Sequence, residues 1–489
     1  MIKLTTLATD KTKIDLLAVP VCEDGEIHTP SNLKTLVAEA KKLEEFSGKS
    51  KQQIILYSLP GTKVKRCLFY GIGAREKINM EVLRSFAGRV VQTAIKAKLN
   101  KVVIAVPDTA SLAAEPAMAI RAMAEGACLA NHIFDKYKEK SEETPLKEIA
   151  LALPARSTRK EQQLVRKVET VCQGTLLARE WVNTPANDKV PAQLARMFTA
   201  AAKDSGLRIH VMDEAQLKKK RFGALLCVSA GSSNPPKLVE MIYAPAKAKK
   251  TIVLVGKGVT FDTGGINLKS SSGLNTMKID MGGAAAVAAT MIAVARLKPK
   301  YRVVGITPLV ENMVSGAATR PGDIVRSFAG KTVEVGNTDA EGRLILIDAL
   351  AYAIKKYNPH TLIDLATLTG ACMVALGDRL AGVFTEDESL SEAIIASGKN
   401  THERCWPLPM PADYKELLKS DMADISNMPS SRYGGAISAA LFLSEFVGDI
   451  RWAHIDIAGT VYAKKGSDYC GPGATGFGVR LLCDLIDKL

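Results

Sequence analysis

The sequence predicts an α/β protein with two domains, a smaller N-terminal α/β domain and a larger C-terminal one whose mixed central sheet is flanked by helices. Three observations support this prediction. The chain has 489 residues, which is long for a single hydrophobic core. Strand-like apolar runs alternate with helix-like runs along the chain, which is typical of α/β folds. Hydrophobic residues make up 47% and charged residues 24% of the chain, as in ordinary globular proteins.

The first part of the chain alternates short apolar runs with longer amphipathic ones. The predicted strands are 14–21, 54–59, 67–71, 101–106 and 149–153, and the predicted helices are 33–45, 80–97 and 113–132. This alternation predicts a largely parallel sheet. The charge-rich segment 136–148 is expected to be a loop. A long amphipathic helix predicted at 159–182 would link a first domain, 1–158, to a second domain, 183–489.

The second domain repeats the alternation of strands and helices. Its predicted strands lie near 224–230, 239–243, 251–255, 302–308, 361–366 and 451–457, and its predicted helices near 191–204, 284–296, 345–357 and 475–488. In open α/β sheets, ligands bind beyond the carboxyl ends of the strands. Lys257 and Asp262 follow one predicted strand and residues 367–370 follow another. We therefore expect a functional site at this edge of the sheet.

The segment from Asn337 to Leu344 carries the most chemical information. If this segment is extended, the side chains of Asp339, Glu341 and Arg343 emerge on one face, because side chains in a strand alternate with a period of two. The apolar run that follows, 344–347, favours burial of the segment. Buried carboxylates need partners, and a metal cation satisfies two of them at once.

The region upstream of that segment offers further polar groups at the ends of predicted elements. Lys257 and Asp262 lie in a glycine-rich turn, Lys269 follows them, and Asp280 precedes an alanine-rich helix. Each residue taken singly has a simpler interpretation, because Asp280 could cap that helix and Asp262 could belong to an ordinary turn. The spacing around Lys257 does not match a phosphate-binding P-loop. Together with Asp339 and Glu341, these residues favour two divalent ions that share carboxylates.

These motifs resemble those of the leucine aminopeptidase (cytosol aminopeptidase) family of cytosolic two-metal exopeptidases. The resemblance covers roughly residues 170–489, and the first 165 residues resemble the family only loosely. It implies that 183–489 is a catalytic peptidase domain. The matching segments are 182–187, 255–265, 277–287, 337–344, 364–371 and 454–459.

The resemblance implies a ligand set for two divalent metal ions, Mn²⁺ or Zn²⁺. One ion would be held by Asp262, Asp339 and Glu341, and the other by Lys257, Asp262, Asp280 and Glu341. Asp262 and Glu341 would bridge the two ions and offset their mutual repulsion. Lys257 can bind a metal only as the neutral amine, which requires a strongly lowered pKa.

The resemblance also implies the remaining catalytic groups and the substrate. Lys269 and Arg343 would assist a metal-bridging water, with a bicarbonate at Arg343 as general base. The pocket for the first substrate residue would be walled by Met277, Thr367, Gly370 and Ala458, although ordinary core packing is a close alternative for Met277 and Ala458. The implied activity is release of unblocked N-terminal residues, with leucine and other apolar residues preferred, from peptides during intracellular turnover.

Charge and cysteine content bear on partners and location. The first 165 residues hold 26 basic and 19 acidic side chains, half of the net charge of +14. A basic N-terminal domain could bind nucleic acid or contribute to an oligomer, but no aromatic or arginine-rich motif accompanies the charge, so a solvated surface is favoured. Nine cysteines without paired spacing favour reduced thiols and a cytoplasmic location.

Two other classes of function remain open from the sequence, and the family suggests an assembly. Two-metal carboxylate sites also serve phosphoesterases, although the chain lacks histidine motifs for metals. DNA binding through the basic N-terminal domain is the second alternative. No apolar run approaches the length of a membrane span, so no membrane association is expected. The resemblance implies a homo-hexamer.

Overall fold

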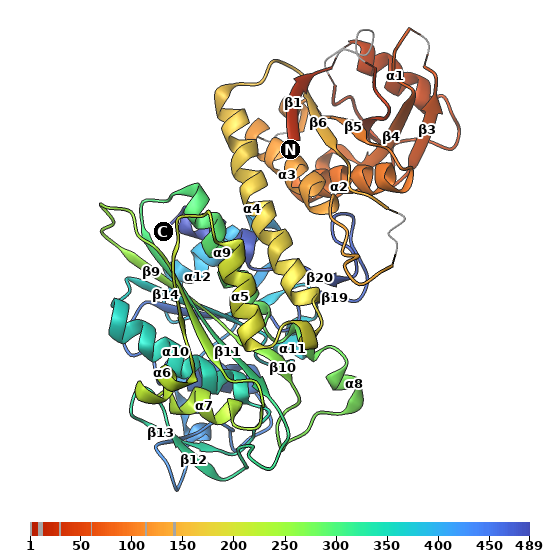
Figure 1. The fold of residues 1–489 in the computed structure, drawn as a ribbon. Helices are drawn as coiled ribbons and strands as arrows, with labels where there is room; N and C mark the ends of the chain where they lie inside the picture. The colour runs from red at the N-terminus through yellow and green to blue at the C-terminus, as the bar shows by residue number, and fades with distance from the viewer. Residues whose placement is uncertain (1, 8–12, 29–30, 60, 113–114, 140–142) are drawn as a thin grey trace. The chain divides into compact units, whose positions relative to one another are not determined.

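The computed structural model describes all residues except 1, 8–12, 29–30, 60, 113–114 and 140–142 (Figure 1). The chain forms two compact units. Unit 1 comprises Met1–Cys172 with Lys464–Pro472, and unit 2 comprises Gln173–Ala463 with Gly473–Leu489. The helix predicted at 159–182 is α4 (Arg159–Asn183), and the division between the units falls inside it.

Unit 1 is built on a six-stranded sheet in the order β1-β6-β5-β2-β4-β3. All neighbouring strands in it are parallel except β3, which runs antiparallel to β4. Its strands are β1 (Ile2–Thr6), β2 (Leu17–Cys22), β3 (Gln53–Tyr57), β4 (Arg66–Gly73), β5 (Lys101–Ala105) and β6 (Glu148–Leu153). Its helices before α4 are α1 (Ser31–Lys41), α2 (Met80–Lys96) and α3 (Pro116–Ala130).

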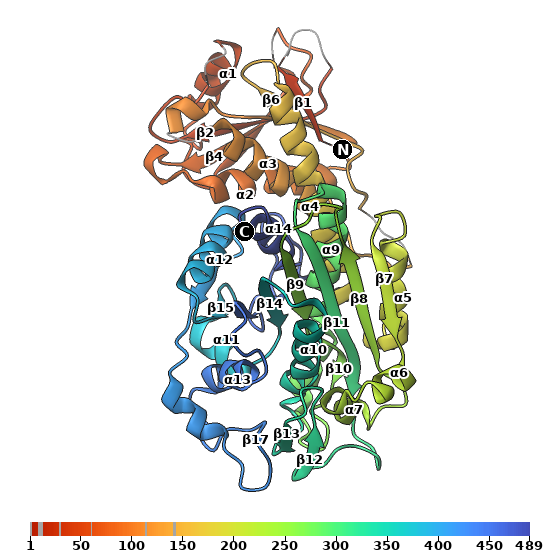
Figure 2. The same ribbon diagram turned by 90° about the vertical axis from the view of Figure 1, so that its left-hand side faces the viewer.

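The helices of unit 1 cover both faces of the sheet, with α1 on one face and α2 and α3 on the other (Figures 1 and 2). Leu33, Leu36 and Ala40 of α1 pack in one hydrophobic cluster with alternate residues of β2. Helices α2 and α3 approach closely because Gly126 has no side chain; a Cβ there would lie 2.0 Å from the carbonyl oxygen of Arg84. The prediction of a largely parallel sheet is confirmed.

Two strands of unit 1 differ from the prediction. Strand β1 was not predicted, because five residues that alternate isoleucine, lysine, leucine and two threonines give a weak signal. The predicted strand at 14–21 begins later, at Leu17, and Ile14 makes only an isolated bridge with Val64. Residues 113–114 of the predicted helix 113–132 and residues 140–142 of the predicted loop lie outside the described residues.

Unit 2 is built on a nine-stranded mixed sheet in the order β16-β15-β18-β14-β9-β11-β8-β7, with β10 paired to β11. The central strands β18, β14, β9 and β11 are parallel, whereas β8 runs antiparallel to β11 and β15 runs antiparallel to β18. The strands are β7 (Arg208–Met212), β8 (Lys237–Tyr243), β9 (Thr251–Gly256), β10 (Gly258–Asp262), β11 (Arg302–Asn312), β14 (Thr361–Ala366), β15 (Ala381–Phe384), β16 (Cys405–Pro407) and β18 (Trp452–Asp456).

Helices cover both faces of this sheet, which confirms the prediction of a mixed sheet flanked by helices. They are α5 (Pro191–Ala201), α6 (Glu214–Lys219), α7 (Gly223–Ser229), α8 (Ser271–Leu274), α9 (Gly282–Leu297), α10 (Glu341–Tyr357), α11 (Gly370–Leu376), α12 (Glu388–Thr401), α13 (Gly435–Ser444) and α14 (Val479–Ile486). Short strands β12 (Asp323–Arg326), β13 (Thr332–Val335) and β17 (Ile425–Ser426) form a separate three-stranded sheet. Strands β19 (Tyr462–Ala463) and β20 (Gly473–Ala474) form a two-stranded one.

Helices α9 and α10 lie against opposite faces of the central strands. Leu344, Leu346 and Ile347 of α10 share a hydrophobic cluster with Val253 and Val255 of β9. On the other face, Gly305 of β11 makes room for α9, since a Cβ at this glycine would lie 2.5 Å from Cγ of Met291. Such double-sided burial explains the near-continuous apolar runs of these strands.

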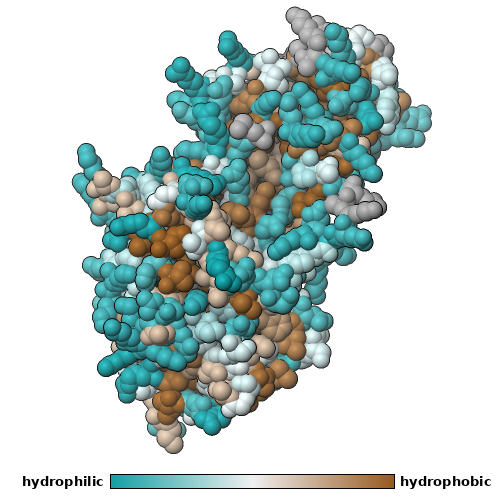
Figure 3. All heavy atoms as spheres, viewed as in Figure 1, coloured by the Kyte–Doolittle hydropathy of each residue, from teal (hydrophilic) through white to brown (hydrophobic). Residues whose placement is uncertain are grey.

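The segment Met277–Leu297 is long and apolar enough to cross a membrane by length and composition alone, contrary to the expectation that no apolar run approaches that length. However, 83% of its apolar window is buried inside the protein, as in the core helix of a globular domain. Hydrophilic residues cover much of the molecular face in Figure 3.

The predicted strand at 224–230 is wrong, because this segment forms helix α7. A short apolar run cannot be assigned to strand or helix by periodicity alone. The carboxylate of Asp348 accepts a hydrogen bond from the backbone N–H of Leu225 at 2.9 Å, in the first turn of α7. This tertiary contact satisfies a free donor of the helix end and is absent from any local sequence pattern.

Replacing Asp387 by Ala is expected to destabilise unit 2 by about 1 kcal/mol, as for other N-cap substitutions. Asp387 caps α12 by accepting from the N–H of Leu390 at 2.7 Å, and it pairs with Arg451 at 2.8 Å. The hydrogen bond from Arg451 lowers the pKa of this carboxyl group. The charged carboxylate of Asp387 therefore stabilises the folded protein fully above the pKa of about 3.9 that it has in the unfolded chain. This stabilisation is lost as the pH falls through the lower pKa of the folded state.

Urea unfolding of wild type and Asp387→Ala at pH 7 and at pH 3 measures this effect. The difference in free energy of unfolding should shrink at pH 3. A difference that is larger at pH 3 than at pH 7 would contradict the assigned role of the carboxylate.

Candidate metal centre

The carboxyl ends of the central strands converge on one cluster of charged side chains. Lys257 lies between β9 and β10, and Asp262 is the last residue of β10. Asp280 follows the single turn Met277–Ile279 before α9, and Glu341 is the first residue of α10. The rule that ligands bind beyond the carboxyl ends of strands thus placed Lys257 and Asp262 correctly.

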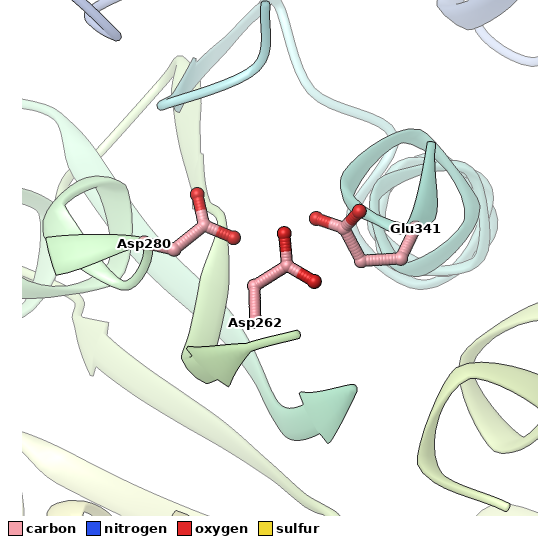
Figure 4. Close-up of side chains that lie close together, drawn as sticks. All are labelled: Asp262, Asp280 and Glu341. Carbon is pink, nitrogen blue, oxygen red and sulfur yellow. The ribbon is translucent and has the colours of Figure 1, made fainter. Parts of the chain in front are cut away.

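The carboxylates of Asp262, Asp280 and Glu341 point toward one another from three different elements (Figure 4). One oxygen of each lies within 4.8 Å of the others, and all three residues are buried. Burial raises the pKa of Asp262 and Asp280, and the neighbouring carboxylate of Glu341 raises it further. So close a grouping of acidic groups requires compensating positive charge.

Lys257 provides part of that charge from the centre of the cluster. Its Nζ lies 2.7 Å from Oδ1 of Asp280 and 2.8 Å from Oε1 of Glu341, and it donates to the carbonyl oxygen of Thr367 at 2.9 Å. Burial acts to lower the pKa of Lys257, but the carboxylates of Asp280, Glu341 and Asp262 outweigh burial and raise it. The ammonium group of Lys257 therefore lies among the same carboxylate oxygens that would surround a bound cation.

Backbone contacts fix Lys257 beside Asp280. The N–H of Val259 donates to the carbonyl oxygen of Asp280 at 3.2 Å, and the N–H of Ala284 donates to that of Lys257 at 2.8 Å. The two segments approach so closely because residues 256 and 283 are glycines. A Cβ at Gly256 would lie 2.4 Å from the carbonyl oxygen of Gly283.

Lys269 and Asp339 complete the cluster on its more exposed side. Nζ of Lys269 lies 2.8 Å from Oδ2 of Asp262 and also pairs with Asp339. Burial raises the pKa of Asp339, and the hydrogen bond from Lys269 opposes that rise. The side chains of Lys269 and Asp339 are 19% and 33% exposed, so a ligand can reach this side of the cluster.

Four carboxylates thus meet two ammonium groups, which leaves an excess of negative charge in a buried setting. Oδ2 of Asp280 is buried and has no hydrogen-bond partner among the described residues. Carboxylate oxygens are ligands that divalent ions accept, and a lysine can join them only as the neutral amine. The residues present therefore fit divalent metal ions.

Arg343 lies two residues beyond Glu341, but it turns away from the carboxylates. Its Nη1 donates to the carbonyl oxygen of Asn427 at 2.7 Å, and its guanidinium lies 5.8 Å from the ring centroid of Phe442. Burial lowers the pKa of Arg343 to about 10. Its buried Nε has no hydrogen-bond partner among the described residues, so it can still donate to an anion.

The extended conformation considered for 337–344 is not the one that the segment adopts. Residues 337–340 form a turn, and α10 begins at Glu341, four residues before the helix predicted at 345–357. In a helix, residues two apart differ by about 200° around the axis, since each residue turns about 100°. Glu341 can therefore face Lys257 while Arg343 faces Asn427, and the shared face expected for Asp339, Glu341 and Arg343 does not exist.

The four predicted pocket residues lie at the ends of neighbouring elements. Thr367 follows β14, Gly370 begins α11, Ala458 follows β18, and Met277 begins the turn that leads to Asp280. Thr367 is tied to the cluster, because its hydroxyl donates to Oδ1 of Asp280 at 2.7 Å. A Cβ at Gly370 would meet nothing within 4 Å, so space is open at that residue.

Two buried asparagines that the sequence did not predict hold the cluster in place. Nδ2 of Asn312 donates to Oδ1 of Asp262 at 2.8 Å and to the carbonyl oxygen of Thr338 at 3.0 Å. Asn427 contacts the turn at 336–340 and Arg343. Asn312 ends the apolar run of β11, so the rule of strand ends could have found it. Asn427 follows the two-residue strand β17 and has no comparable signal.

Comparison with known proteins agrees with this arrangement. Residues 176–483 match the catalytic domain of the cytosol aminopeptidase family, and residues 20–141 match its N-terminal domain. The chain is 40% identical to a probable cytosol aminopeptidase of Desulfovibrio desulfuricans, over 99% of this chain and 98% of that one. It is also 40% identical to one of Chlorobium limicola, over 100% of this chain and 99% of the other.

Two solved structures resemble the fold over nearly the whole chain. A mutant of tomato leucine aminopeptidase has a TM-score of 0.89 and 34% identity, and the match covers 100% of this chain and 96% of the other. The bottromycin maturation enzyme BotP in complex with Mn has a TM-score of 0.85 and 33% identity, covering 97% of this chain and 99% of BotP. The chain therefore belongs to the cytosol aminopeptidase family and is a hydrolase of the leucyl aminopeptidase class.

Proposed function

We propose that this enzyme releases unblocked N-terminal residues, preferentially leucine and other apolar residues, from peptides with the help of two divalent cations, Mn²⁺ or Zn²⁺. The observation that carries the proposal is the buried group of three carboxylates within 4.8 Å of one another beside Lys257. Asp262, Asp339 and Glu341 would hold one cation. Lys257, Asp262, Asp280 and Glu341 would hold the other. The solved complex of BotP with Mn supports a metal in this family.

The side chains around the carboxylates suit hydrolysis of a peptide bond. Bound divalent cations supply a Lewis acid for the scissile carbonyl and lower the pKa of water. Lys269 is partly exposed beside Asp262, so its ammonium group can donate to the oxygen on which negative charge develops. Arg343 keeps a free buried Nε, and its planar fork suits a small oxyanion such as bicarbonate, which would supply the general base.

The preference for an apolar first residue rests on the pocket residues. Met277, Thr367, Gly370 and Ala458 would offer a thioether, a methyl group and two small residues to the first substrate residue, and of these Thr367 contacts the cluster directly. Open space beside Gly370 supports room for a substrate side chain there. The α-amino group of the substrate would bind at the carboxylates, which a blocked N-terminus cannot do. Such an activity fits peptide turnover in the cytoplasm, as the family name suggests.

Hydrolysis of leucine p-nitroanilide, with Mn²⁺ added or with metal removed by a chelator, tests this function. We expect cleavage only with metal, and no cleavage of N-acetyl-leucine p-nitroanilide. Comparison of leucine with glutamate at the first position tests the apolar preference and should favour leucine at least about tenfold, given the cost of burying a charge. A folded, metal-loaded enzyme that leaves leucine p-nitroanilide intact would contradict the proposal.

A further inference from the structure

Asn427 is a buried residue whose side chain and carbonyl oxygen have partners beside the metal centre. It is 0% exposed and directly follows β17. Its backbone N–H donates to the carbonyl oxygen of Glu334 at 2.9 Å, an extension of the pairing between β17 and β13. Its own carbonyl oxygen accepts from Nη1 of Arg343 at 2.7 Å. The residue therefore joins the three-stranded sheet to the guanidinium of Arg343.

The side chain of Asn427 grips the turn that carries Asp339 and leads into α10. Its Oδ1 accepts from the N–H groups of Gly336 and Asn337, at 2.9 and 3.2 Å. Its Nδ2 donates to the carbonyl oxygens of Asn337 and Ala340, at 2.8 and 3.4 Å. Only an amide offers an acceptor and two donors in one small side chain. Aspartate would lose both donors, and alanine would leave four backbone groups of the turn without these partners.

The position of the Arg343 guanidinium depends mainly on its hydrogen bond to Asn427. Among the described residues, the carbonyl oxygen of Asn427 is the one hydrogen-bond acceptor that the structure gives its guanidinium, and the other neighbour is the ring of Phe442. The guanidinium is buried, so water cannot replace a lost acceptor without a rearrangement. A shift of the turn at 336–340 would move both Arg343, on the first turn of α10, and its acceptor.

We propose that Asn427 is a positioning residue for the aminopeptidase reaction, which sets the place of the Arg343 guanidinium through its carbonyl oxygen and through the turn at 336–340. This inference rests on the proposed function, in which Arg343 takes part in turnover. Displacements of about 1 Å at such groups can reduce turnover about 100-fold. A residue with only a structural role would change stability and leave turnover per folded molecule unaltered.

The test is a double-mutant cycle between Asn427→Ala and Arg343→Ala, with Mn²⁺-loaded full-length enzyme and leucine p-nitroanilide. Asn427→Ala alone should lower kcat at least about tenfold, with KM changed less than about threefold. In the Arg343→Ala background the same substitution should change kcat less than about threefold, because the group it positions is gone. Equal effects in both backgrounds would overturn the inference.

Two readouts without turnover complete the experiment. Calorimetric titration of Asn427→Ala with Mn²⁺ should give the same number of sites as wild type, and loss of a site would overturn the proposed route through Arg343. A crystal structure of Asn427→Ala should show Nη1 of Arg343 displaced from the carbonyl oxygen of residue 427. An unmoved guanidinium would likewise overturn the inference.

The matched control is Asn131→Ala. Asn131 lies in unit 1, and both polar atoms of its side chain also bind a backbone segment. Its Oδ1 accepts from the N–H of Leu146 at 2.7 Å, and its Nδ2 donates to the carbonyl oxygen of Leu146 at 3.1 Å. This control should lose stability and keep the kcat of wild type. An inactive wild type would refute the proposed function and this inference with it, whereas an additive cycle in an active enzyme would refute only the role of Asn427.

Discussion

Replacing Glu341 by Gln is expected to lower kcat/KM for leucine p-nitroanilide by about 1,000-fold or more, since metal ions contribute several kcal/mol to such reactions. The substitution keeps the size of the side chain and removes one of three converging buried charges. Nζ of Lys257 lies 2.8 Å from Oε1 of Glu341 and 2.7 Å from Oδ1 of Asp280, so in the variant it still has Asp280 as an ionic partner. The cluster then has fewer anionic ligands than two divalent cations require.

Without metal, the same variant should be at least as stable as wild type. The charge of Glu341 raises the pKa of both Asp262 and Asp280, which means that the three carboxylates repel one another. Removal of one charge relieves this repulsion. Differential scanning calorimetry should therefore give a Tm for the metal-free variant no lower than that of metal-free wild type, whereas added Mn²⁺ should raise only the wild-type value.

Glu403→Gln serves as a control for the loss of a buried carboxylate elsewhere. Glu403 is 2% exposed and accepts from the N–H groups of Gly478 and Leu481, at 3.0 and 2.8 Å. The Glu403→Gln substitution is expected to lower the Tm and to leave kcat/KM unchanged. An active Glu341→Gln variant with normal Mn²⁺ binding would contradict the assignment of Glu341 as a ligand.

The chemistry of the centre was more predictable than the geometry of its segments. Lys257, Asp262 and Thr367 could be placed from the sequence, because each follows an apolar strand and the carboxyl ends of parallel strands meet at one edge. The shape of 337–344 could not be predicted, because alternating polar residues fit both a strand and the turn before a helix. Contacts with residues distant in sequence, among them Lys257 and Asn427, hold Glu341 and the turn before it in place.

The supporting residues were the least predictable part of the site. Asn312 and Asn427 act through single amide groups whose partners lie 50 and up to 91 residues away. No local pattern of hydrophobic residues marks such contacts, and a lone asparagine in a loop is usually a turn residue. The same limitation applies to α7, whose first turn is held by Asp348, 123 residues away from Leu225.

Replacing Gly342 by Ala is expected to lower kcat/KM by about 100-fold, as a misplacement of about 1 Å in an active site does, while the Tm changes little. Gly342 is buried in the first turn of α10. A Cβ there would lie 2.5 Å from Cε and 2.7 Å from Nζ of Lys257. Lys257 is 3% exposed and its Nζ is held by Asp280, so the side chain cannot move aside without leaving the cluster.

The stability of α10 itself should not suffer from this substitution. Gly342 does not adopt a positive φ, and alanine is favoured over glycine in helices by up to about 1 kcal/mol. The clash falls on the end of a side chain that serves the site, so the cost should appear in Mn²⁺ affinity and turnover. Calorimetric titration with Mn²⁺ should show at least about a tenfold loss of affinity, comparable with the loss of a group that orients a metal ligand.

Gly126→Ala, in helix α3 of unit 1, is expected to behave in the opposite way for the same chemical change. A Cβ there would lie 2.0 Å from the backbone carbonyl oxygen of Arg84, which cannot rotate away. This variant should lose several degrees of Tm and keep its turnover per folded molecule, because α3 lies outside the catalytic unit. If Gly342→Ala instead lost stability and kept its Mn²⁺ affinity and kcat/KM, the place of Lys257 among the carboxylates would not matter for the reaction, and its assignment as a ligand would be wrong.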